Sequence, residues 1–254
     1  LASRVVRPCF TADETLAGAG LRAEPFPEEL PAGVAAALRE RGIEELYSHQ
    51  AAAFRAALAG RPVVVATPTA SGKSLCFHLP VLEALTRDPD ARALYMYPTK
   101  ALARDQEAGL RELLVAAGLG AGAAGGRPPA SAVVFDGDTP ADARRAARER
   151  AGILITNPDM LHTGILPHHA SWARTFQHLK YIVIDEIHTY KGVFGSHLAN
   201  VLRRLLRVAR FHGANPVLLG ATATIGNPRE HAARLFGVPE ASVTRSPRPR
   251  SPRH

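Results

Sequence analysis

Cysteine and long apolar runs are the features this sequence has least of. Its 254 residues include two cysteines, Cys9 and Cys76, and no Cys-x-x-C pair. Two cysteines cannot form a disulfide framework, and nothing in their spacing suggests a zinc site. This cysteine usage is typical of a reducing compartment, so we expect a cytoplasmic protein.

No apolar stretch reaches the length of a transmembrane helix. The first residues, LASRVVRPCFTADETLAG, also lack the continuous apolar core of a signal peptide. We therefore expect no membrane association. Residues 1–24 show no clear hydrophobic period and are expected to form a loose N-terminal extension.

Acidic residues are outnumbered, because 31 Lys and Arg oppose 23 Asp and Glu and give a net charge of +8. This balance favours a polyanionic partner. Four of the arginines lie in the last ten residues, so the rest of the chain is only mildly basic. The segment 241–254 is rich in Arg, Pro and Ser and is predicted to be a disordered tail.

What the sequence does have is a series of short apolar runs separated by helical patterns. The runs are apolar throughout, as in strands that are buried on both faces of a parallel sheet. Helical patterns separate these runs, which predicts a β-α-β-α order, and two further helical patterns, over 27–41 and 48–59, precede the first run. The fold class is therefore α/β, with a doubly wound sheet. The predicted strands are 62–66, 93–97, 132–136, 152–156, 181–185 and 216–220.

A polar cluster follows each predicted strand. The carboxyl ends of parallel strands share one edge of a sheet, where ligands bind in open α/β folds. Six clusters on one edge predict a site there, at residues 67–74, 98–100, 136–138, 156–158, 185–186 and 222–224.

The stretch VVVATPTASGKSLCFHLP, residues 63–80, resembles the phosphate loop G-x-x-x-x-G-K-[ST], with Thr67 in place of the first glycine. Gly72, Lys73 and Ser74 offer backbone N–H donors, a lysine for the terminal phosphates and a hydroxyl for magnesium. The alternative is an ordinary strand-turn-helix joint that contains a lysine. Asp185 and Glu186 favour the first interpretation, because a strand-terminal carboxylate can bind Mg²⁺ and its neighbour can polarise a water molecule for attack on the γ-phosphate.

Several motifs occur in the order found in superfamily 2 helicases of the DEAD/DEAH type. They are YSHQ (47–50), TPTASGKS (67–74), YPTKALARDQ (97–106), TNPDML (156–161), VIDEIH (183–188) and TATIGNP (222–228). The string DEIHTYKGVFGSHLANVLRRL (185–205) further resembles helicases of the MrfA (mitomycin repair factor A) type. The resemblance implies a three-layer RecA-like P-loop domain over residues 25–240. It also implies an ATP-dependent DNA helicase that moves 3′ to 5′ and acts in DNA repair.

Roles for individual residues follow from this resemblance. The expected catalytic residues are Lys73, Asp185, Glu186 and His188, with Ser74 and Asp185 binding Mg²⁺. The expected ATP-binding residues are Tyr47, Gln50, Thr69, Ala70, Ser71, Gly72, Lys73 and Ser74, with Gln50 reading adenine. Single-stranded nucleic acid is expected at Thr99, Lys100, Arg104, Thr156 and Asn157, and Thr222 and Thr224 are expected to couple the two ligands.

The sequence departs from the helicase pattern in small ways and in one large way. Ala70 replaces a common glycine, and Thr-Ala-Thr replaces Ser-Ala-Thr at 222–224. After residue 240 the chain enters its Arg-rich tail, so the second RecA-like domain, which carries an arginine finger in these helicases, is expected to be absent. The isolated chain is therefore expected to be poorly active.

Two other functions stay open from the sequence. The same motifs serve motors that move duplex DNA without separating its strands, and no motif reads out unwinding itself. A truncated fragment that binds ATP and nucleic acid weakly, without turnover, is the non-enzymatic alternative.

Four further features have structural explanations that we favour. Arg203, Arg207 and Arg210 share one helical face and are expected to face solvent. The lone Trp172 is expected to be a packing anchor, and Cys76 a small core residue. His162, His168 and His169 have no metal-ligand spacing and are expected in a surface loop.

Overall fold

The computed structural model describes residues 23–67, 72–121, 128–223 and 226–245. The described residues form a seven-stranded parallel sheet in the order β5-β6-β4-β7-β8-β3-β9. A separate small antiparallel sheet is formed by β1 (Ala23–Glu24) and β2 (Leu46–Tyr47). The strands of the large sheet are β3 (Val63–Ala66), β4 (Arg92–Met96), β5 (Ala132–Val134), β6 (Ile153–Thr156), β7 (Leu179–Ile184), β8 (Val217–Thr222) and β9 (Thr244–Arg245).

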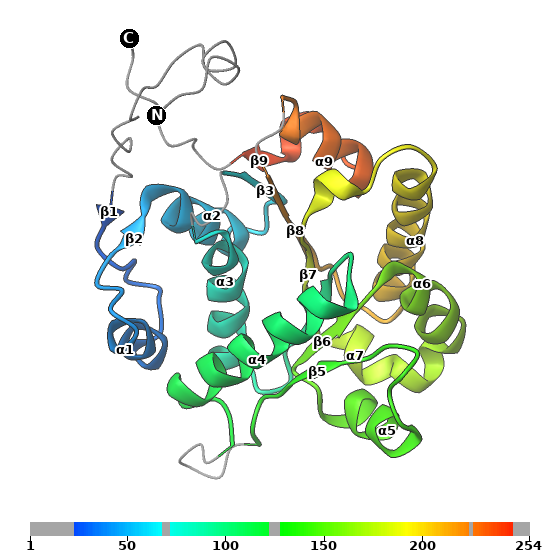
Figure 1. The fold of residues 1–254 in the computed structure, drawn as a ribbon, viewed down its shortest axis with the longest axis horizontal. Coiled ribbons are helices and arrows are strands. Elements are labelled where there is room, and N and C mark those ends of the chain that lie inside the picture. Colours follow the sequence, from blue (N-terminus) through cyan, green and yellow to red (C-terminus); the bar gives the residue numbers. More distant parts are fainter. Residues whose placement is uncertain (1–22, 68–71, 122–127, 224–225, 246–254) are drawn as a thin grey trace, which may run out of the picture.

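Helices cover both faces of the sheet (Figure 1). One face packs against α1 (Ala32–Glu40), α2 (Ser48–Leu58), α3 (Lys73–Arg87) and α4 (Lys100–Ala116). The other face packs against α5 (Ala141–Arg150), α7 (Ala173–Gln177), α8 (Gly192–Phe211) and α9 (Pro228–Phe236), and against a helical segment built from α6 (Pro158–Met160), a π-helical turn (Leu161–Ile165) and a 3₁₀ stretch (Leu166–Trp172). The prediction of a three-layer α/β domain is confirmed.

Alternation along the strands divides the core in two. In β7, Tyr181 and Val183 pack towards α1–α4, whereas Ile182 and Ile184 pack towards α8. Successive side chains of a strand point to opposite faces, so a strand that is covered on both faces must be apolar throughout. This requirement explains the six uninterrupted apolar runs in the sequence.

The structure corrects three predictions about local structure. The first helix begins at Ala32 and not at residue 27, because Pro31 disfavours helical geometry at Leu30 and stands at the N-cap. The predicted disorder from residue 241 is wrong for residues 244–245, which pair with Val63 and Val64 as β9. The three histidines at 162, 168 and 169 lie in the helical segment between β6 and β7, and not in a loop.

Residues 23 and 24, expected to belong to a loose extension, instead pair with Leu46 and Tyr47 as β1, and residues 1–22 lie outside the described residues. The expectations for Trp172, Cys76 and the arginines of α8 hold. Trp172 is 2% exposed and stands edge-on to Phe135, with ring centroids 4.8 Å apart. Cys76 is buried, and burial raises the pKa of its thiol. Arg203, Arg207 and Arg210 are exposed, opposite the buried leucines of α8. Within the described ranges, no helix is both long and apolar enough to cross a membrane.

Candidate functional site

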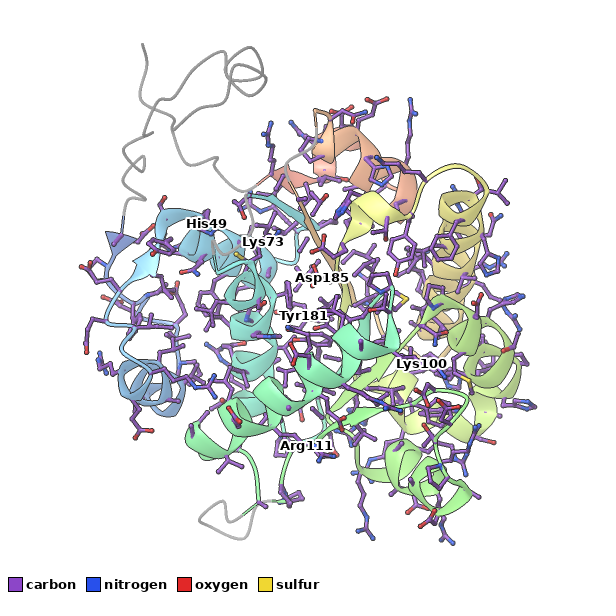
Figure 2. The ribbon with its side chains drawn as sticks, viewed as in Figure 1. His49, Lys73, Lys100, Arg111, Tyr181 and Asp185 are labelled. Carbon is purple, nitrogen blue, oxygen red and sulfur yellow. The ribbon has the colours of Figure 1, made fainter. Side chains whose placement is uncertain are left out.

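The sheet order separates the predicted site residues into two neighbouring groups. The phosphate-binding and metal-binding candidates follow β3 and β7, the coupling candidates lie at the end of β8 between them, and the nucleic-acid candidates lie at the ends of β4 and β6. In Figure 2, Lys73, Asp185 and Lys100 follow one another across the sheet, in the order of their strands. Parallel pairing therefore brings both groups to one edge, side by side.

The phosphate loop joins a buried strand to the start of a helix. β3 is buried along its length, and α3 begins at Lys73, directly after Gly72. Gly72 has φ 68°, a left-handed conformation that favours glycine. The first turn of α3 begins at this point, and the N-terminal end of a helix is where backbone N–H groups can bind an anion. Thr69, Ala70 and Ser71 lie outside the described residues.

Lys73 is held loosely. Its Nζ donates to the carbonyl oxygen of Thr67 over 3.4 Å, and its side chain is only partly buried. The positive charge is close enough to Asp185 to favour the ionised form of that carboxylate. A long hydrogen bond of this kind can be exchanged for a phosphate oxygen at small cost.

Gln50 connects α2 to the phosphate loop. Its Oε1 accepts from the Tyr47 backbone N–H, and its Nε2 donates to the Gly72 carbonyl oxygen, each over 2.9 Å. The side chain is 3% exposed. In this arrangement both ends of the amide have protein partners, so reading of adenine requires at least one of these bonds to change. Tyr47 is 38% exposed, and its ring stacks on His49.

Asp185 stands at the carboxyl end of β7 and is 9% exposed. Burial raises the pKa of this carboxyl to about 6, and the charge of Glu186 acts in the same direction. A hydrogen bond from the Glu186 N–H to Oδ1, 2.8 Å long, and the charge of Lys73 oppose the shift. The ionised carboxylate is thus poorly solvated, and a bound cation would stabilise it.

Glu186 is the one non-glycine residue with positive φ among the described residues, at φ 48°. Such a backbone costs roughly 1 kcal/mol or more, and non-glycine residues adopt it most often at functional sites. The conformation turns the Glu186 side chain towards His188, whose Nδ1 lies 2.9 Å from Oε2.

His188 also reaches the strand that follows. The Ala223 N–H donates to the same Nδ1 over 3.4 Å, so this nitrogen faces both Glu186 and the end of β8. The hydrogen bond is the one from Ala223, and Glu186 Oε2 is buried without a hydrogen-bond partner among the described residues. Donation from Nδ1 to this oxygen would need a proton on Nδ1 and loss of the bond from Ala223, so the two contacts exclude each other. Thr222 precedes Ala223 and is buried, with no hydrogen-bond partner for its hydroxyl among the described residues. Thr224 lies outside the described residues.

The residues present fit a magnesium-bound nucleotide. Among the described residues, no group of three or more His, Cys, Asp or Glu side chains could enclose a metal ion. Mg²⁺ does not need such a cage, because it is usually held by one or two carboxylates and by substrate phosphates, with bound water. In the part of the chain that the structure describes, the hydroxyls of Thr222, Tyr97 and Tyr190 are buried without partners. Burial raises the pKa of both tyrosines, and the charge of Asp185 adds to this shift. Polar atoms left open near Asp185 are consistent with a ligand or water at this edge.

On the nucleic-acid side, two predicted residues cap helices. Thr99 Oγ1 accepts from the Leu102 N–H over 3.3 Å at the start of α4. Asn157 Oδ1 accepts from the Met160 N–H over 2.8 Å at the start of α6. The Thr99 cap begins α4 so that Lys100 and Arg104, one turn apart, are both exposed on it.

Thr156 differs from the prediction. It is 3% exposed, and its hydroxyl donates to the Phe135 carbonyl oxygen over 2.8 Å. This placement does not support a direct contact between Thr156 and a nucleic-acid strand. Thr156 instead fixes the end of β5, where the loop of residues 135–140 begins.

Sequence reasoning missed the partners within that loop. Lys100 Nζ forms an ion pair with Asp138, at 2.6 Å, and Arg144 binds the loop from α5. The polar cluster 136–138 is visible in the sequence, and its Asp-Gly-Asp-Thr composition is typical of a turn. Nothing in the sequence pairs it with Lys100, which lies 38 positions earlier.

Comparison with known proteins relates the chain to helicases. The family model for DEAD/DEAH box helicases matches residues 47–231. The chain is 47% identical over 233 residues to the ATP-dependent helicase YprA of Bacillus subtilis, which corresponds to 92% of this chain and 30% of YprA. It is 41% identical over 206 residues to the ATP-dependent helicase HRQ1 of Saccharomyces cerevisiae, covering 79% of this chain and 18% of HRQ1.

Solved structures show the same similarity. The DUF1998 helicase MrfA bound to DNA and AMPPNP superposes with a TM-score of 0.83 and 47% identity, over 89% of this chain and 30% of that one. The DEAD-box helicase Mss116 superposes with a TM-score of 0.70 at 19% identity, over 86% of this chain and 43% of that one, and shares the fold. The chain thus spans less than a third of the length of YprA, HRQ1 and MrfA.

Proposed function

The chain belongs to the DEAD/DEAH box helicase family, and from this premise we propose that it is the ATP-binding RecA-like domain of an ATP-dependent DNA helicase. The observation that carries the proposal is the adjacency of two groups at one sheet edge. Lys73 and Asp185 can bind a nucleotide and its metal ion there. The exposed Lys100 and Arg104, next to them, can bind a nucleic-acid strand. The names of YprA and HRQ1 as ATP-dependent helicases, and of MrfA as bound to DNA and AMPPNP, support it.

In this proposal the residues around the phosphate loop bind and orient the triphosphate. The N-terminal turn of α3 donates backbone N–H groups, and Lys73 exchanges its long bond with Thr67 for phosphate oxygens. Ser74 and Asp185 hold Mg²⁺, which neutralises charge on the phosphates when bound. Tyr47 and Gln50 border the base.

Glu186 is the proposed general base. Its carboxylate accepts a proton from the attacking water, and His188 holds that carboxylate in place through Nδ1. Because Nδ1 also faces Ala223, a change at Glu186 can reach the end of β8, where Thr222 lies, and Thr222 and Thr224 are the residues that we propose to couple the two ligands. This route is our proposal for coupling.

Thr99, Lys100, Arg104 and Asn157 are the proposed strand contacts. Contacts to phosphates carry no sequence information, so binding should be indifferent to sequence and sensitive to salt. We also propose movement from 3′ to 5′ and a role in DNA repair, both on the basis of the resemblance. A cytoplasmic location is proposed on the basis of composition. A motor that translocates on duplex DNA would use the same residues.

Full activity is proposed to require a second RecA-like domain. An arginine finger contributes about 10³- to 10⁵-fold in related phosphoryl-transfer enzymes. Strand separation also needs two bodies that open and close on one strand. We therefore expect the 254-residue chain to bind ATP and hydrolyse it slowly.

The test is nucleotide binding by the purified chain, measured by calorimetry with Mg²⁺ and ATP. Lys73→Ala should abolish binding while the melting temperature stays unchanged, because Lys73 is partly exposed and its hydrogen bond to the Thr67 carbonyl oxygen is long. Lys180→Ala, which removes an exposed lysine from β7, is the control. Equal affinity in wild type and Lys73→Ala would refute the nucleotide site.

A further inference from the structure

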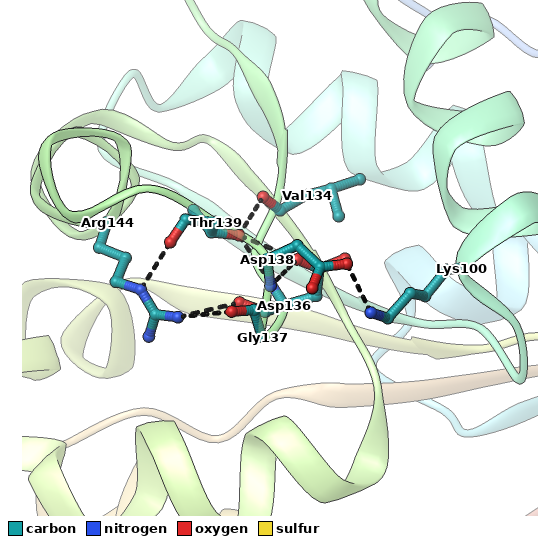
Figure 3. A network of polar contacts seen from close by, with 7 residues as sticks. All are labelled: Lys100, Val134, Asp136, Gly137, Asp138, Thr139 and Arg144. Atoms are coloured by element: carbon teal, nitrogen blue, oxygen red, sulfur yellow. Dashed lines mark hydrogen bonds and ion pairs between the residues drawn. The ribbon is translucent and has the colours of Figure 1, made fainter.

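Lys100 does not point freely into solvent, although it is the first basic residue of the proposed strand contacts. Its Nζ lies 2.6 Å from Oδ2 of Asp138, in an ion pair between α4 and the loop after β5 (Figure 3). The two side chains are 53% and 62% exposed, so a strand can reach both. The hydrogen bond between them lowers the pKa of Asp138 and raises that of Lys100.

The loop that carries Asp138 is held from within. Asp136 is 5% exposed, and its Oδ1 accepts from the Asp138 N–H over 2.9 Å. Thr139 Oγ1 accepts from the Asp136 N–H over 2.9 Å and lies 3.2 Å from Asp136 Oδ1. These bonds fix the backbone on both sides of Asp138 and leave its own carboxylate with Lys100 as partner.

The same loop is fastened to the helix that follows it. Arg144 donates to the carbonyl oxygens of Thr139, Asp136 and Gly137 over 2.8, 3.3 and 3.2 Å (Figure 3). Its guanidinium also lies over the Phe135 ring, 5.3 Å from the centroid. Asp138 therefore cannot follow Lys100 if that lysine turns to another anion.

We propose that Asp138 is an internal competitor for the phosphate site at Lys100, so that a nucleic-acid strand binds there by displacing a carboxylate that the loop holds in place. This inference rests on the proposed function, because it takes Lys100 as a strand contact. Carboxylate and phosphate oxygens are alternative acceptors for one ammonium group. The displaced carboxylate stays beside the strand and repels it, so Asp138 weakens strand binding in both ways.

The expected effect is modest and has a definite sign. Exposed ion pairs are weak, so Asp138→Asn should tighten binding of single-stranded DNA by about two- to fivefold at moderate salt. The amide keeps the shape of the side chain and the turn. Affinity falls as salt rises, and freeing Lys100 for a phosphate should make the slope of log affinity against log salt steeper, that is more negative, by up to about 0.7.

The experiment measures fluorescence anisotropy of a labelled oligo(dT) of about 12 nucleotides. Wild type, Asp138→Asn, Lys100→Ala and the double variant are titrated at several salt concentrations. Asp90→Asn is the matched control, because it removes the same charge from an exposed ion pair, with Arg174, at the amino-terminal end of β4. Thermal melts establish that each variant is folded.

The inference is supported if Asp138→Asn binds more tightly than Asp90→Asn and if this gain is clearly smaller in the Lys100→Ala background, where only the relief of repulsion remains. It is overturned if Asp138→Asn matches Asp90→Asn, if the full gain survives without Lys100, or if affinity falls, because a fall would make Asp138 a support for Lys100. If Lys100→Ala binds as tightly as wild type in both backgrounds, the strand contact itself is wrong, and the proposed function loses that residue.

Discussion

The side-chain amide of Gln50 donates a 2.9 Å hydrogen bond to the carbonyl oxygen of Gly72. This bond ties the N-terminus of α2 to the last residue before α3, across 22 positions of sequence. It depends on glycine in two respects. The φ of 68° suits glycine, and a Cβ at this position would lie 2.5 Å from Gln50 Nε2.

Replacing Gly72 with alanine should therefore weaken both the fold and ATP binding. The left-handed backbone costs about 1 kcal/mol for a residue with a Cβ, and displacement of Gln50 adds to this. Gly60→Ala is the matched control, because Gly60 has φ 71° and nothing within 4 Å of a Cβ. Urea denaturation should show a larger loss for Gly72→Ala, and calorimetry should show reduced ATP affinity for that variant alone. Equal losses of stability would mean that the contact with Gln50 contributes nothing.

Gln50 should also make the site prefer adenine. A side-chain amide can pair with the N6 donor and N7 acceptor of adenine, as in base readout. We expect ATP to compete for the site better than GTP in the wild type. Gln50→Ala should remove this preference and lower affinity for both nucleotides, because it also releases Tyr47 and Gly72. A variant that loses affinity but keeps the preference would restrict Gln50 to holding the loop.

Trp172 should be the stability anchor of the face that carries α5 and α8. It is buried in the second core cluster, edge-on to Phe135. Trp172→Ala should cost about 3–5 kcal/mol, as other large-to-small aromatic changes do. Trp172→Phe should cost less, because it keeps a ring against Phe135. Urea denaturation followed by circular dichroism measures both, since the chain has one tryptophan and fluorescence is lost with it. A cost below about 1 kcal/mol for Trp172→Ala would contradict the packing.

Residues at strand ends could be placed from the sequence because one physical rule governs them. Lys73 and Asp185 follow apolar runs, and parallel strands end at one edge, so the pattern alone brings them together. β9 could not be predicted this way. Two residues in a segment rich in Arg, Pro and Ser have no hydrophobic period, and they pair only because β3 offers an open edge.

The roles of polar side chains were harder to predict for the same kind of reason. Thr156 lies in a recognisable motif, yet its hydroxyl is buried against Phe135 by the neighbouring strand. Lys100 and Asp138 belong to different motifs, and their contact depends on how α4 and the loop after β5 meet. Such contacts depend on tertiary packing, which composition and residue spacing do not predict.

Asp185 makes the stability of the unliganded protein depend on pH in a definite direction. Burial raises the pKa of its carboxyl to about 6, above its ordinary value of about 3.9 in an unfolded chain. The folded state then binds the proton more tightly, so this contribution is full below about pH 4 and is lost as pH rises through about 6. Asp185→Asn has no such loss and should exceed the wild type in stability at pH 8 by about 1–3 kcal/mol, with a much smaller difference at pH 4.5. Asp90→Asn should show the opposite sign at pH 8, because Arg174 lowers the pKa of Asp90. Urea denaturation without Mg²⁺ at both pH values measures these differences.

Only the ionised carboxylate of Asp185 binds a cation, so Mg²⁺-dependent ATP binding should strengthen through the same pH range in the wild type and be lost in Asp185→Asn. An Asn variant that is less stable at pH 8, or one that keeps Mg²⁺-dependent ATP binding, would show that Asp185 is neither a poorly solvated carboxylate nor the metal ligand.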